Sequence, residues 1–271
     1  KLARGELESR DPEQIMKRCK SLLESGNKEI KLTCQDTASY GLDIGTSFPD
    51  LLDRLLSKEG EYKIRIGMMN PDTALPILDE IIDKMRDDRI YKFLHLPLQS
   101  GSNRILKKMN RNYTVKEWMT IVDCFRESFP DLTLSTDIIA GFPGETVEDF
   151  EDTKKIIKNV KPDIVNVTRF SPRPGTKADS MENQIHSRKK KKRSKELSNL
   201  RLKISRDINK IYVGRTEEVL VLEEGKDNTL KARMDNYKVV IIKNNEKKLL
   251  GEKVKVEIVS AEDVYLVGKL I

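Results

Sequence analysis

Metal-binding side chains are scarce in this sequence, which has three cysteines and two histidines among 271 residues. Cys19, Cys34 and Cys124 lie far apart, so they form neither the spacing of a disulfide framework nor a close metal-binding motif. Isolated cysteines most often behave as small buried hydrophobic side chains, and we expect three buried thiols. The sequence therefore predicts no metal site within this chain.

Long hydrophobic runs are also missing. No segment approaches the roughly 18 consecutive apolar residues of a membrane-spanning helix, and the amino-terminal segment has no apolar signal region. Hydrophobic residues (37%) and charged residues (35%) instead occur together in periodic segments, which indicates a folded protein with a core. We expect a cytoplasmic protein without a membrane partner.

Basic residues are in excess, with 51 Lys and Arg against 44 Asp and Glu and a net charge of +7. This excess favours an anionic partner such as nucleic acid, although a basic surface without a specific partner has the same composition. It is densest at residues 189–193, within a helix-like segment at 187–210.

Apolar periodicity predicts alternating helices and strands in the first part of the chain. Helices are expected near residues 11–26, 48–58, 73–86, 114–128 and 147–160, and strands near 30–34, 62–69, 92–96, 132–139 and 164–170. This alternation indicates an α/β fold with a parallel sheet, either a barrel or a doubly wound sheet. A β/α barrel begins with a strand, whereas this series begins with a helix. We therefore expect a missing first strand and an exposed sheet edge that allows self-association.

After residue 211 the pattern changes to short apolar runs at 219–222, 237–242, 254–259 and 264–270, separated by Gly, Asn and Asp. Such runs are typical of a small all-β barrel. The predicted organisation is a partial parallel β/α barrel at 1–180, a basic linker helix at 181–211 and a β-barrel at 212–271.

Several segments carry a resemblance to a known enzyme family. They are Lys1–Gly5, Leu32–Gly41, His95–Ser102, Met109–Tyr113, Thr136–Glu145 and Ser171–Thr176. In this order they resemble the methylthiotransferases of the radical S-adenosylmethionine (SAM) superfamily. Lys1–Gly5, together with Thr37–Gly45, Arg65–Met68 and Tyr91–Leu96, is most similar to the archaeal and eukaryotic branch that acts on N6-threonylcarbamoyladenosine in tRNA. Gly214–Thr216 and Asp235–Val240 resemble a TRAM domain.

The resemblance implies a radical SAM enzyme that uses SAM, two [4Fe–4S] clusters and an electron donor to add a methylthio group to C2 of the modified adenosine in tRNA. In the family, the CxxxCxxC motif that binds the radical-generating cluster immediately precedes the segment matching Lys1–Gly5. This sequence has no such triad, so the resemblance implies an enzyme truncated after the motif, with its cluster ligands upstream of Lys1. We expect this chain to bind no cofactor, to contain no catalytic residue and to be inactive alone.

Candidate cofactor-binding residues lie in the family segments, near the predicted carboxyl ends of the strands. They are Gln35, Asp36, His95, Gln99, Ser100, Arg111, Asp137, Gly141 and Glu145. Each also has a structural interpretation: a strand-end cap for Gln35 and Asp36, a core histidine, a surface ion pair for Arg111, or a tight turn around Gly141. Both interpretations are open at this point.

Candidate RNA-binding residues combine cations with one aromatic ring, which suits phosphate contacts and base stacking. They are Lys189, Lys190, Lys191, Lys192, Arg193, Arg215, Arg233, Tyr237 and Lys238. Similar residues also occur on the surface of any soluble barrel or solvated helix. Two other functions compete with tRNA methylthiolation at N6-threonylcarbamoyladenosine: a non-catalytic RNA-binding module, and a methylthiotransferase for isopentenyladenosine or a ribosomal protein.

Overall fold

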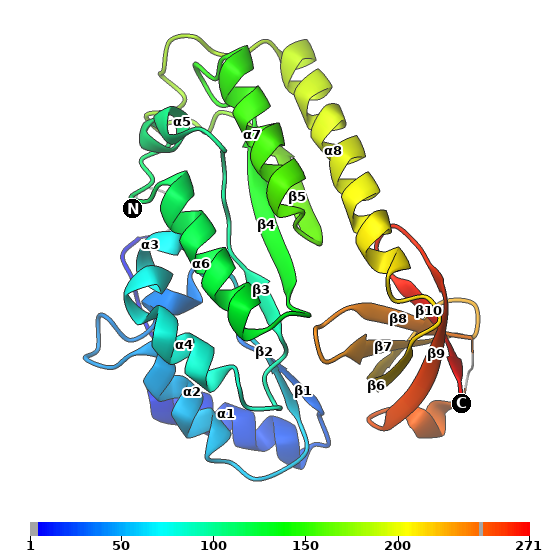
Figure 1. Ribbon diagram of the computed structural model, residues 1–271. Helices are drawn as coiled ribbons and strands as arrows, with labels where there is room; N and C mark the ends of the chain where they lie inside the picture. Colours follow the sequence, from blue (N-terminus) through cyan, green and yellow to red (C-terminus); the bar gives the residue numbers. More distant parts are fainter. Residues whose placement is uncertain (1–4, 244–245) are drawn as a thin grey trace.

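The computed structural model describes residues 5–243 and 246–271, and Figure 1 shows a curved α/β part joined by one long helix to a small barrel. Residues 1–4, which belong to the first segment of the family resemblance, lie outside the described residues. The α/β fold class and the closed carboxy-terminal barrel are both confirmed.

Five short strands form the sheet in the described part of the chain. They are β1 (Glu29–Lys31), β2 (Lys63–Arg65), β3 (Phe93–His95), β4 (Thr133–Ala140) and β5 (Ile164–Arg169). β1 pairs with β2, and β3, β4 and β5 pair in that order, all in parallel. Isolated parallel bridges from Ile64 to Ile90 and from Met68 to His95 join the two groups. The strands therefore follow one another in chain order, as in successive β–α units.

Helices follow the strands and cover one face of the sheet (Figure 1). They are α1 (Pro12–Glu24), α2 (Phe48–Leu56), α3 (Pro71–Ala74), α4 (Leu78–Lys84), α5 (Asn103–Lys108), α6 (Val115–Ser128) and α7 (Val147–Val160). Capping boxes begin α6 and α7, because Thr114 and Thr146 each exchange hydrogen bonds with the residue three positions on. Trp118 is fully buried in the core beneath these helices, and its indole N–H donates to Leu96 O at 3.1 Å.

The structure differs from the sequence prediction at three elements. The helix expected at 73–86 is interrupted at Leu75–Ile77 by a 3-10 turn that contains Pro76, because proline has no N–H for the helical hydrogen bond. The short helix α5 and the strand β7 (Leu230–Met234) were not predicted. In β7, the buried residues alternate with Lys231 and Arg233, so the strand has no continuous apolar run.

The barrel consists of β6 (Thr216–Glu224), β7, β8 (Val239–Ile242), β9 (Lys253–Ala261) and β10 (Leu266–Leu270), closed in the order β10-β8-β7-β6-β9. It has its own hydrophobic core, which includes Tyr212. The long helix α8 (Ser187–Lys210) buries Leu197 and Ile204 against the core of the α/β part and then leads into the barrel. Within the described ranges, no helix is long and apolar enough to cross a membrane.

Candidate functional site

The face of the sheet that points away from the helices is polar, and we call it the inner face. Its residues include Arg65, Phe93, His95, Asp137 and Asn166. Their strand neighbours Ile64 and Leu94 are fully buried in the core on the opposite face, because successive strand residues point to opposite sides. The carboxyl ends of the strands form one edge of this face, which we call the rim.

A hydrogen-bonded network joins three strands on the inner face. His95 Nε2 lies 2.8 Å from Asp137 Oδ2, and Asn166 Nδ2 donates to Asp137 Oδ1 at 2.9 Å. Burial raises the pKa of Asp137, but the hydrogen bonds and the charge of its partners outweigh burial and hold that pKa below its ordinary value. An ionised carboxylate can only accept hydrogen bonds, so His95 carries a proton on Nε2. The structure thus brings two of the predicted site residues into contact.

Asp36 is a capping residue at the rim, which is the structural interpretation considered for it above. Its carboxylate accepts from Asn70 N at 3.0 Å and from Thr73 Oγ1 at 2.7 Å, so it ties the segment after β1 to the start of α3. Gln35, the preceding residue, is exposed. A contact between Gln35 and a cofactor stays a prediction.

Gln99 adopts an unusual backbone conformation just beyond β3. Its φ of 65° lies in the left-handed region, which is unfavourable for a residue with a Cβ. Its N–H donates to Asp137 O at 2.8 Å and its carbonyl accepts from Ile139 N at 3.0 Å, which holds the strained conformation in place. Gln99 and Ser100 are both buried. Strain of this kind, held by neighbouring strands, is often found where a protein binds a ligand.

Arg111 follows α5 on the loop that leads to α6. Its Nε atom is buried and has no hydrogen-bond partner among the described residues. Leaving such a donor unsatisfied costs about 1–3 kcal/mol, which an occupant with an acceptor oxygen would remove. The surface ion pair considered for Arg111 is not among the contacts of the described residues, and a contact between Arg111 and a cofactor stays a prediction.

Glu145 and Arg193 were assigned to different sites from the sequence, but the structure pairs them. Arg193 donates to the Glu145 carboxylate and, at 3.1 Å, to its carbonyl oxygen, and both residues are buried. The Gly141 N–H also donates to Glu145 Oε2 at 2.9 Å. Burial raises the pKa of Glu145 although Arg193 opposes this effect. Arg193 is therefore engaged inside the protein, which differs from the expectation that it faces RNA.

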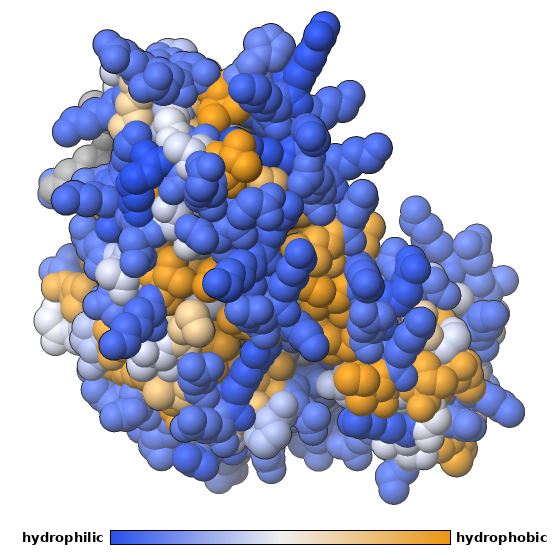
Figure 2. Space-filling view, turned by 45° about the horizontal axis from the view of Figure 1, so that its top comes forward, coloured by the Kyte–Doolittle hydropathy of each residue, from blue (hydrophilic) through white to orange (hydrophobic). Residues whose placement is uncertain are grey.

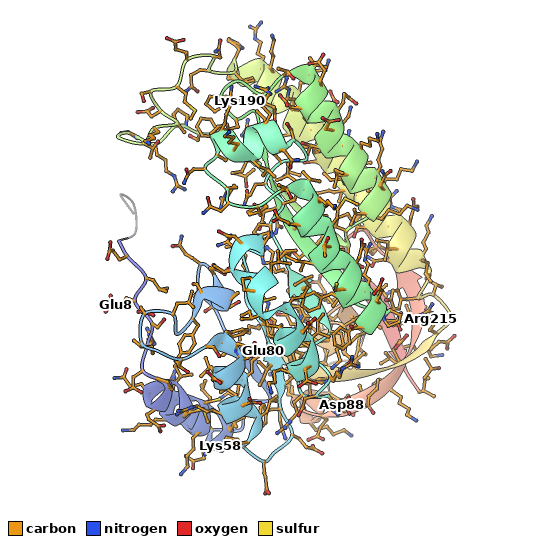
Figure 3. All side chains as sticks on the ribbon, turned by 60° about the vertical axis from the view of Figure 1, so that its left-hand side comes forward. Glu8, Lys58, Glu80, Asp88, Lys190 and Arg215 are labelled. Atoms are coloured by element: carbon orange, nitrogen blue, oxygen red, sulfur yellow. The ribbon has the colours of Figure 1, made fainter. Side chains whose placement is uncertain are left out.

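The other cations of the basic run lie in the first turns of α8, and one of them contacts the rim. Lys189, Lys191 and Lys192 are exposed, whereas Lys190 packs on Gly141 and its Nζ donates to Phe170 O at 3.2 Å. The φ of Gly141 is 79°, and a Cβ there would lie 2.6 Å from Lys190 Cγ, so this position requires glycine. Figure 3 shows Lys190 and Arg215 near opposite ends of α8. The start of α8 therefore lies beside the ends of β4 and β5, where Lys190 contacts Gly141 and Phe170.

Tyr237 and Lys238 lie in the contact between the two domains. The Tyr237 ring is 4.9 Å from the ring of Tyr91 and 5.0 Å from that of Phe93, measured between centroids. Lys238 Nζ lies 2.6 Å from Asp163 Oδ1, and both side chains are 8% exposed. Lys238 is therefore not available to an RNA phosphate in this conformation. Tyr237 and Lys238 instead attach the barrel to the sheet.

Neighbours of Tyr237 extend this contact and were not found from the sequence. Asp235 pairs with Lys63 on β2, and its carbonyl oxygen accepts from Lys92 N at 2.9 Å. Asn236 Nδ2 donates to Asp131 O at 3.1 Å. The arginines behave differently, since Arg233 stacks on Tyr237 at 4.0 Å whereas Arg215 is exposed over the Tyr212 ring.

The described cysteines do not fit an iron–sulfur cluster. Cys19 is buried on α1, Cys34 is exposed after β1, and Cys124 is half-buried on α6. The expectation of three buried thiols is therefore wrong for Cys34, which lies in the loop after a short strand, and holds in full only for Cys19. Among the described residues, no group of three or more His, Cys, Asp or Glu side chains could hold a metal ion. A [4Fe–4S] cluster requires several thiolates at one place, which these three positions do not provide.

Comparisons with known proteins agree with this geometry. The profile of the radical SAM superfamily matches residues 2–157, and that of the TRAM domain matches residues 210–271. The chain is 47% identical over 271 residues to a Pyrococcus horikoshii protein named probable threonylcarbamoyladenosine tRNA methylthiotransferase, covering 100% of this chain and 63% of that protein. It is 38% identical over 272 residues to a Homo sapiens protein named threonylcarbamoyladenosine tRNA methylthiotransferase, covering 99% of this chain and 46% of that protein.

A solved structure supports the fold alone. Coproporphyrinogen III oxidase from Escherichia coli, described as a radical SAM enzyme, matches with a TM-score of 0.50 and 15% identity, covering 73% of this chain and 48% of that chain. The chain spans less than two thirds of the length of the curated relatives above. Since the matched profile covers more than half of the chain and coincides with the parallel β/α sheet, the chain belongs to the radical SAM superfamily and ends in a TRAM domain.

Proposed function

We propose that this chain is part of a tRNA methylthiotransferase that adds a methylthio group to C2 of N6-threonylcarbamoyladenosine. The observation that carries the proposal is the identity of 47% to a relative of that name, which extends over the whole chain and includes both domains. Sequence identity of this extent across two domains favours a shared substrate more strongly than a shared fold does.

The rim supports a site for SAM and the target nucleoside. When bound, one SAM molecule would supply the 5′-deoxyadenosyl radical on one-electron reduction, and a second SAM molecule would supply the methyl group. We infer that Gln99, Ser100 and Arg111 hold SAM, because they combine a strained turn with an unpartnered buried donor. The His95–Asp137 pair then presents a positioned N–H donor and an ionised carboxylate on the inner face beside them.

The iron–sulfur clusters of the proposed enzyme are not held by the described residues of this chain. We therefore propose that their cysteines are supplied by a part of the protein outside this chain. On this basis the chain alone binds tRNA but does not turn over, and an electron donor is needed only by the longer protein.

Reconstitution of the longer protein tests this proposal. A protein extended to include the cluster-binding cysteines is reconstituted with iron and sulfide and supplied with SAM, a reductant and tRNA that carries N6-threonylcarbamoyladenosine. We expect the 2-methylthio nucleoside to be detected by mass spectrometry of the digested tRNA. The matched control is this chain alone under the same conditions, which should form no product.

The competing functions give different results in the same assay. Product formed only on tRNA carrying isopentenyladenosine, or only on a ribosomal protein, overturns the proposed target. Tight tRNA binding without product on any of the three substrates, although the cluster is fully loaded, favours a non-catalytic RNA-binding module.

A further inference from the structure

A second polar site lies where the sheet, α8 and the barrel meet. It is a pocket of about 140 Å³ lined by residues of β4, β5, α8, β7 and the β9–β10 hairpin. Its lining includes Thr133, Arg201, Arg233, Tyr237 and Lys238. This pocket lies at the amino-terminal ends of β4 and β5, away from the rim.

The pocket has a net positive charge. Lys238 and Asp163 pair with each other, so their charges compensate. Arg233 donates Nη1–H to Tyr237 O at 2.9 Å and stacks on its ring, which leaves most of its five N–H groups for other partners. The side chain of Arg201 has no hydrogen bond or ion pair with another described residue. Its charge helps to lower the pKa of the Asp263 carboxylate, which is itself paired with Arg206.

An unsatisfied hydroxyl in the same lining indicates a polar occupant. Thr133 is 2% exposed, and its Oγ1 atom has no hydrogen-bond partner among the described residues. An orphaned buried hydroxyl is unfavourable, so an occupant that can hydrogen-bond to it is favoured. Two arginines in the same lining favour an anionic oxygen group, since planar guanidinium groups bind phosphate through paired hydrogen bonds.

The size of the pocket limits what it can hold. Sites that enclose a small organic ligand usually have about 300–1,000 Å³, so a pocket of about 140 Å³ is large enough for a phosphate group but not for a nucleoside. Tyr265 lines its mouth and is 36% exposed. A base attached to a bound phosphate would therefore lie outside, against this ring.

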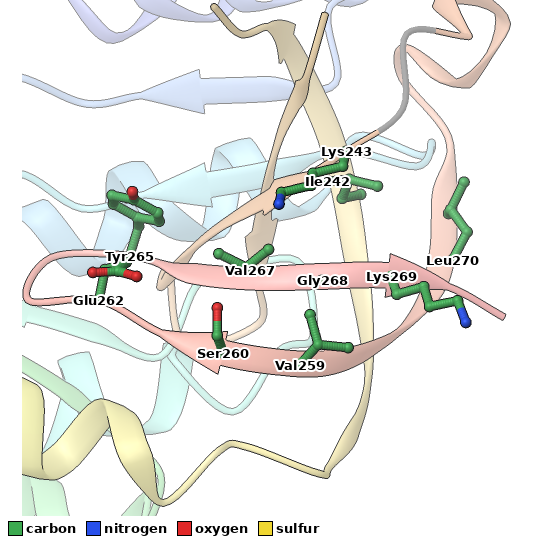
Figure 4. Close-up of a pocket in the computed structure, with 10 residues that line it drawn as sticks. All are labelled: Ile242, Lys243, Val259, Ser260, Glu262, Tyr265, Val267, Gly268, Lys269 and Leu270. Carbon is green, nitrogen blue, oxygen red and sulfur yellow. The ribbon is translucent and has the colours of Figure 1, made fainter. Parts of the chain in front are cut away.

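Tyr265 also lines a larger, open hollow of about 580 Å³ on the outside of the barrel. Figure 4 shows Tyr265 at one end of this hollow and Lys269 at the other, with Lys243 on the neighbouring strand. Val259 is exposed within it, and Figure 2 shows hydrophobic side chains gathered on the barrel lobe. Alternating cations and apolar or aromatic surface suit a nucleic-acid strand, whose phosphates and bases alternate in the same way.

We propose that the pocket binds a backbone phosphate of an RNA strand, that the adjoining base stacks on Tyr265, and that the strand continues over β10 towards Lys243 and Lys269. This inference rests on the proposed function only in identifying the RNA as tRNA. It assigns RNA contact to Arg201 and Tyr265, which sequence reasoning did not select.

The test is the affinity of this chain for tRNA and for a short single-stranded RNA, measured by fluorescence anisotropy over a range of salt concentrations. Arg201→Gln should weaken binding and reduce the slope of log K against log salt by about 0.7–0.9, since one phosphate contact is lost. Tyr265→Ala should weaken binding about tenfold without changing the slope, whereas Tyr265→Phe, which keeps the ring, should bind like the unchanged protein.

The matched control is Arg18→Gln, which removes an exposed arginine from α1 and should leave both quantities unchanged. Unchanged binding in both Arg201→Gln and Tyr265→Ala overturns the proposal. The proposal is also overturned if inorganic phosphate competes for the pocket while RNA has no effect, because that result would identify a site for free phosphate. Because the assay uses unmodified RNA and no SAM, its failure is distinguishable from a failure of methylthiolation.

Discussion

At the residue scale, the buried pair of Glu145 and Arg193 fastens α8 to the loop after β4. Removing one member of a buried ion pair usually costs about 3–5 kcal/mol, because the other charge is left without compensation. We predict that Arg193→Gln lowers the free energy of unfolding by about this amount at pH 7.5. Lys192→Gln, at the exposed neighbouring position, should change it by less than about 0.5 kcal/mol.

The same pair predicts a dependence on pH. The folded-state pKa of Glu145 is raised by burial, and a group of this kind contributes stability below its unfolded pKa that is lost as pH rises through its folded pKa. The deficit of Arg193→Gln, measured by urea denaturation, should therefore narrow between pH 7.5 and pH 5, as Glu145 takes up a proton. A deficit that is equal at both pH values contradicts this explanation.

The contribution of Asp137 to stability depends on pH in the opposite direction to that of Glu145. Its folded-state pKa is lowered by its hydrogen bonds to His95 and Asn166 despite burial, so its contribution to stability is present at neutral pH and is lost as pH falls through that pKa. We predict that Asp137→Asn lowers the free energy of unfolding by about 1–2 kcal/mol at pH 7. The difference from the unchanged protein should shrink below about pH 4. If the free energies of unfolding of Asp137→Asn and the unchanged protein differed more in acid than at pH 7, the hydrogen bonds of Asp137 to His95 and Asn166 would not explain the effect.

The sequence predicted those site residues that lie in the family segments, but it did not predict which residues they contact. His95 and Asp137 were both selected, but their contact depends on the register of β3 and β4, which apolar periodicity does not determine. Asn166 was missed although it is a polar residue at an inward position of β5, between apolar neighbours. Arg193 was assigned to the surface because a run of basic residues does not show which side chain turns inward.

At the scale of elements, exposed lysines at the start of α8 are close in sequence to Lys190, which contacts the rim beside the proposed nucleoside site. Changing Lys189, Lys191 and Lys192 together to Ala should lower tRNA affinity and reduce the slope of log K against log salt by up to about 2–3, because each lysine can replace one counterion. Binding titrations at several salt concentrations measure this effect. The matched control changes Lys17, Arg18 and Lys20 on α1, and equal effects of the two triple variants would contradict it.

The turn at 235–238 between β7 and β8 couples the two domains. Tyr237 contacts the rings of Tyr91 and Phe93, which are buried although they lie outside the main core cluster. Tyr237→Ala should lower the free energy of unfolding by about 2–3 kcal/mol and separate thermal unfolding into two transitions, since both ring contacts are lost. Tyr237→Phe should keep one transition. A single cooperative transition in Tyr237→Ala, measured by calorimetry, would show that other contacts couple the domains.

Elements were easier to predict than their contacts. Thr114 and Thr146, with their capping partners, mark the starts of α6 and α7 from local hydrogen bonds alone. The interruption near Pro76 and the strand β7 depend on tertiary packing around them, so local periodicity did not reveal them. Nothing in the sequence around Tyr237 indicates that its ring packs against a strand about 145 residues earlier in the chain.

At the scale of the whole molecule, α8 separates two surfaces that are both proposed to contact RNA. Its 24 residues correspond to about 36 Å of helix. The rim and the exposed lysines lie near one end, and the barrel with the interdomain pocket lies near the other (Figure 1, Figure 3). A folded RNA can span this distance, whereas a free nucleoside cannot. The arrangement therefore predicts that affinity for tRNA greatly exceeds affinity for the modified nucleoside alone.

We propose that the rim receives the target nucleoside while the barrel holds RNA farther along. The most direct measurement uses tRNA with a photo-crosslinking adenosine analogue at the target position, bound to this chain and analysed by mass spectrometry of the linked peptides. We predict links to the rim, in the segments 95–111 and 137–145. Links confined to residues 212–271, with none at the rim, would contradict the account.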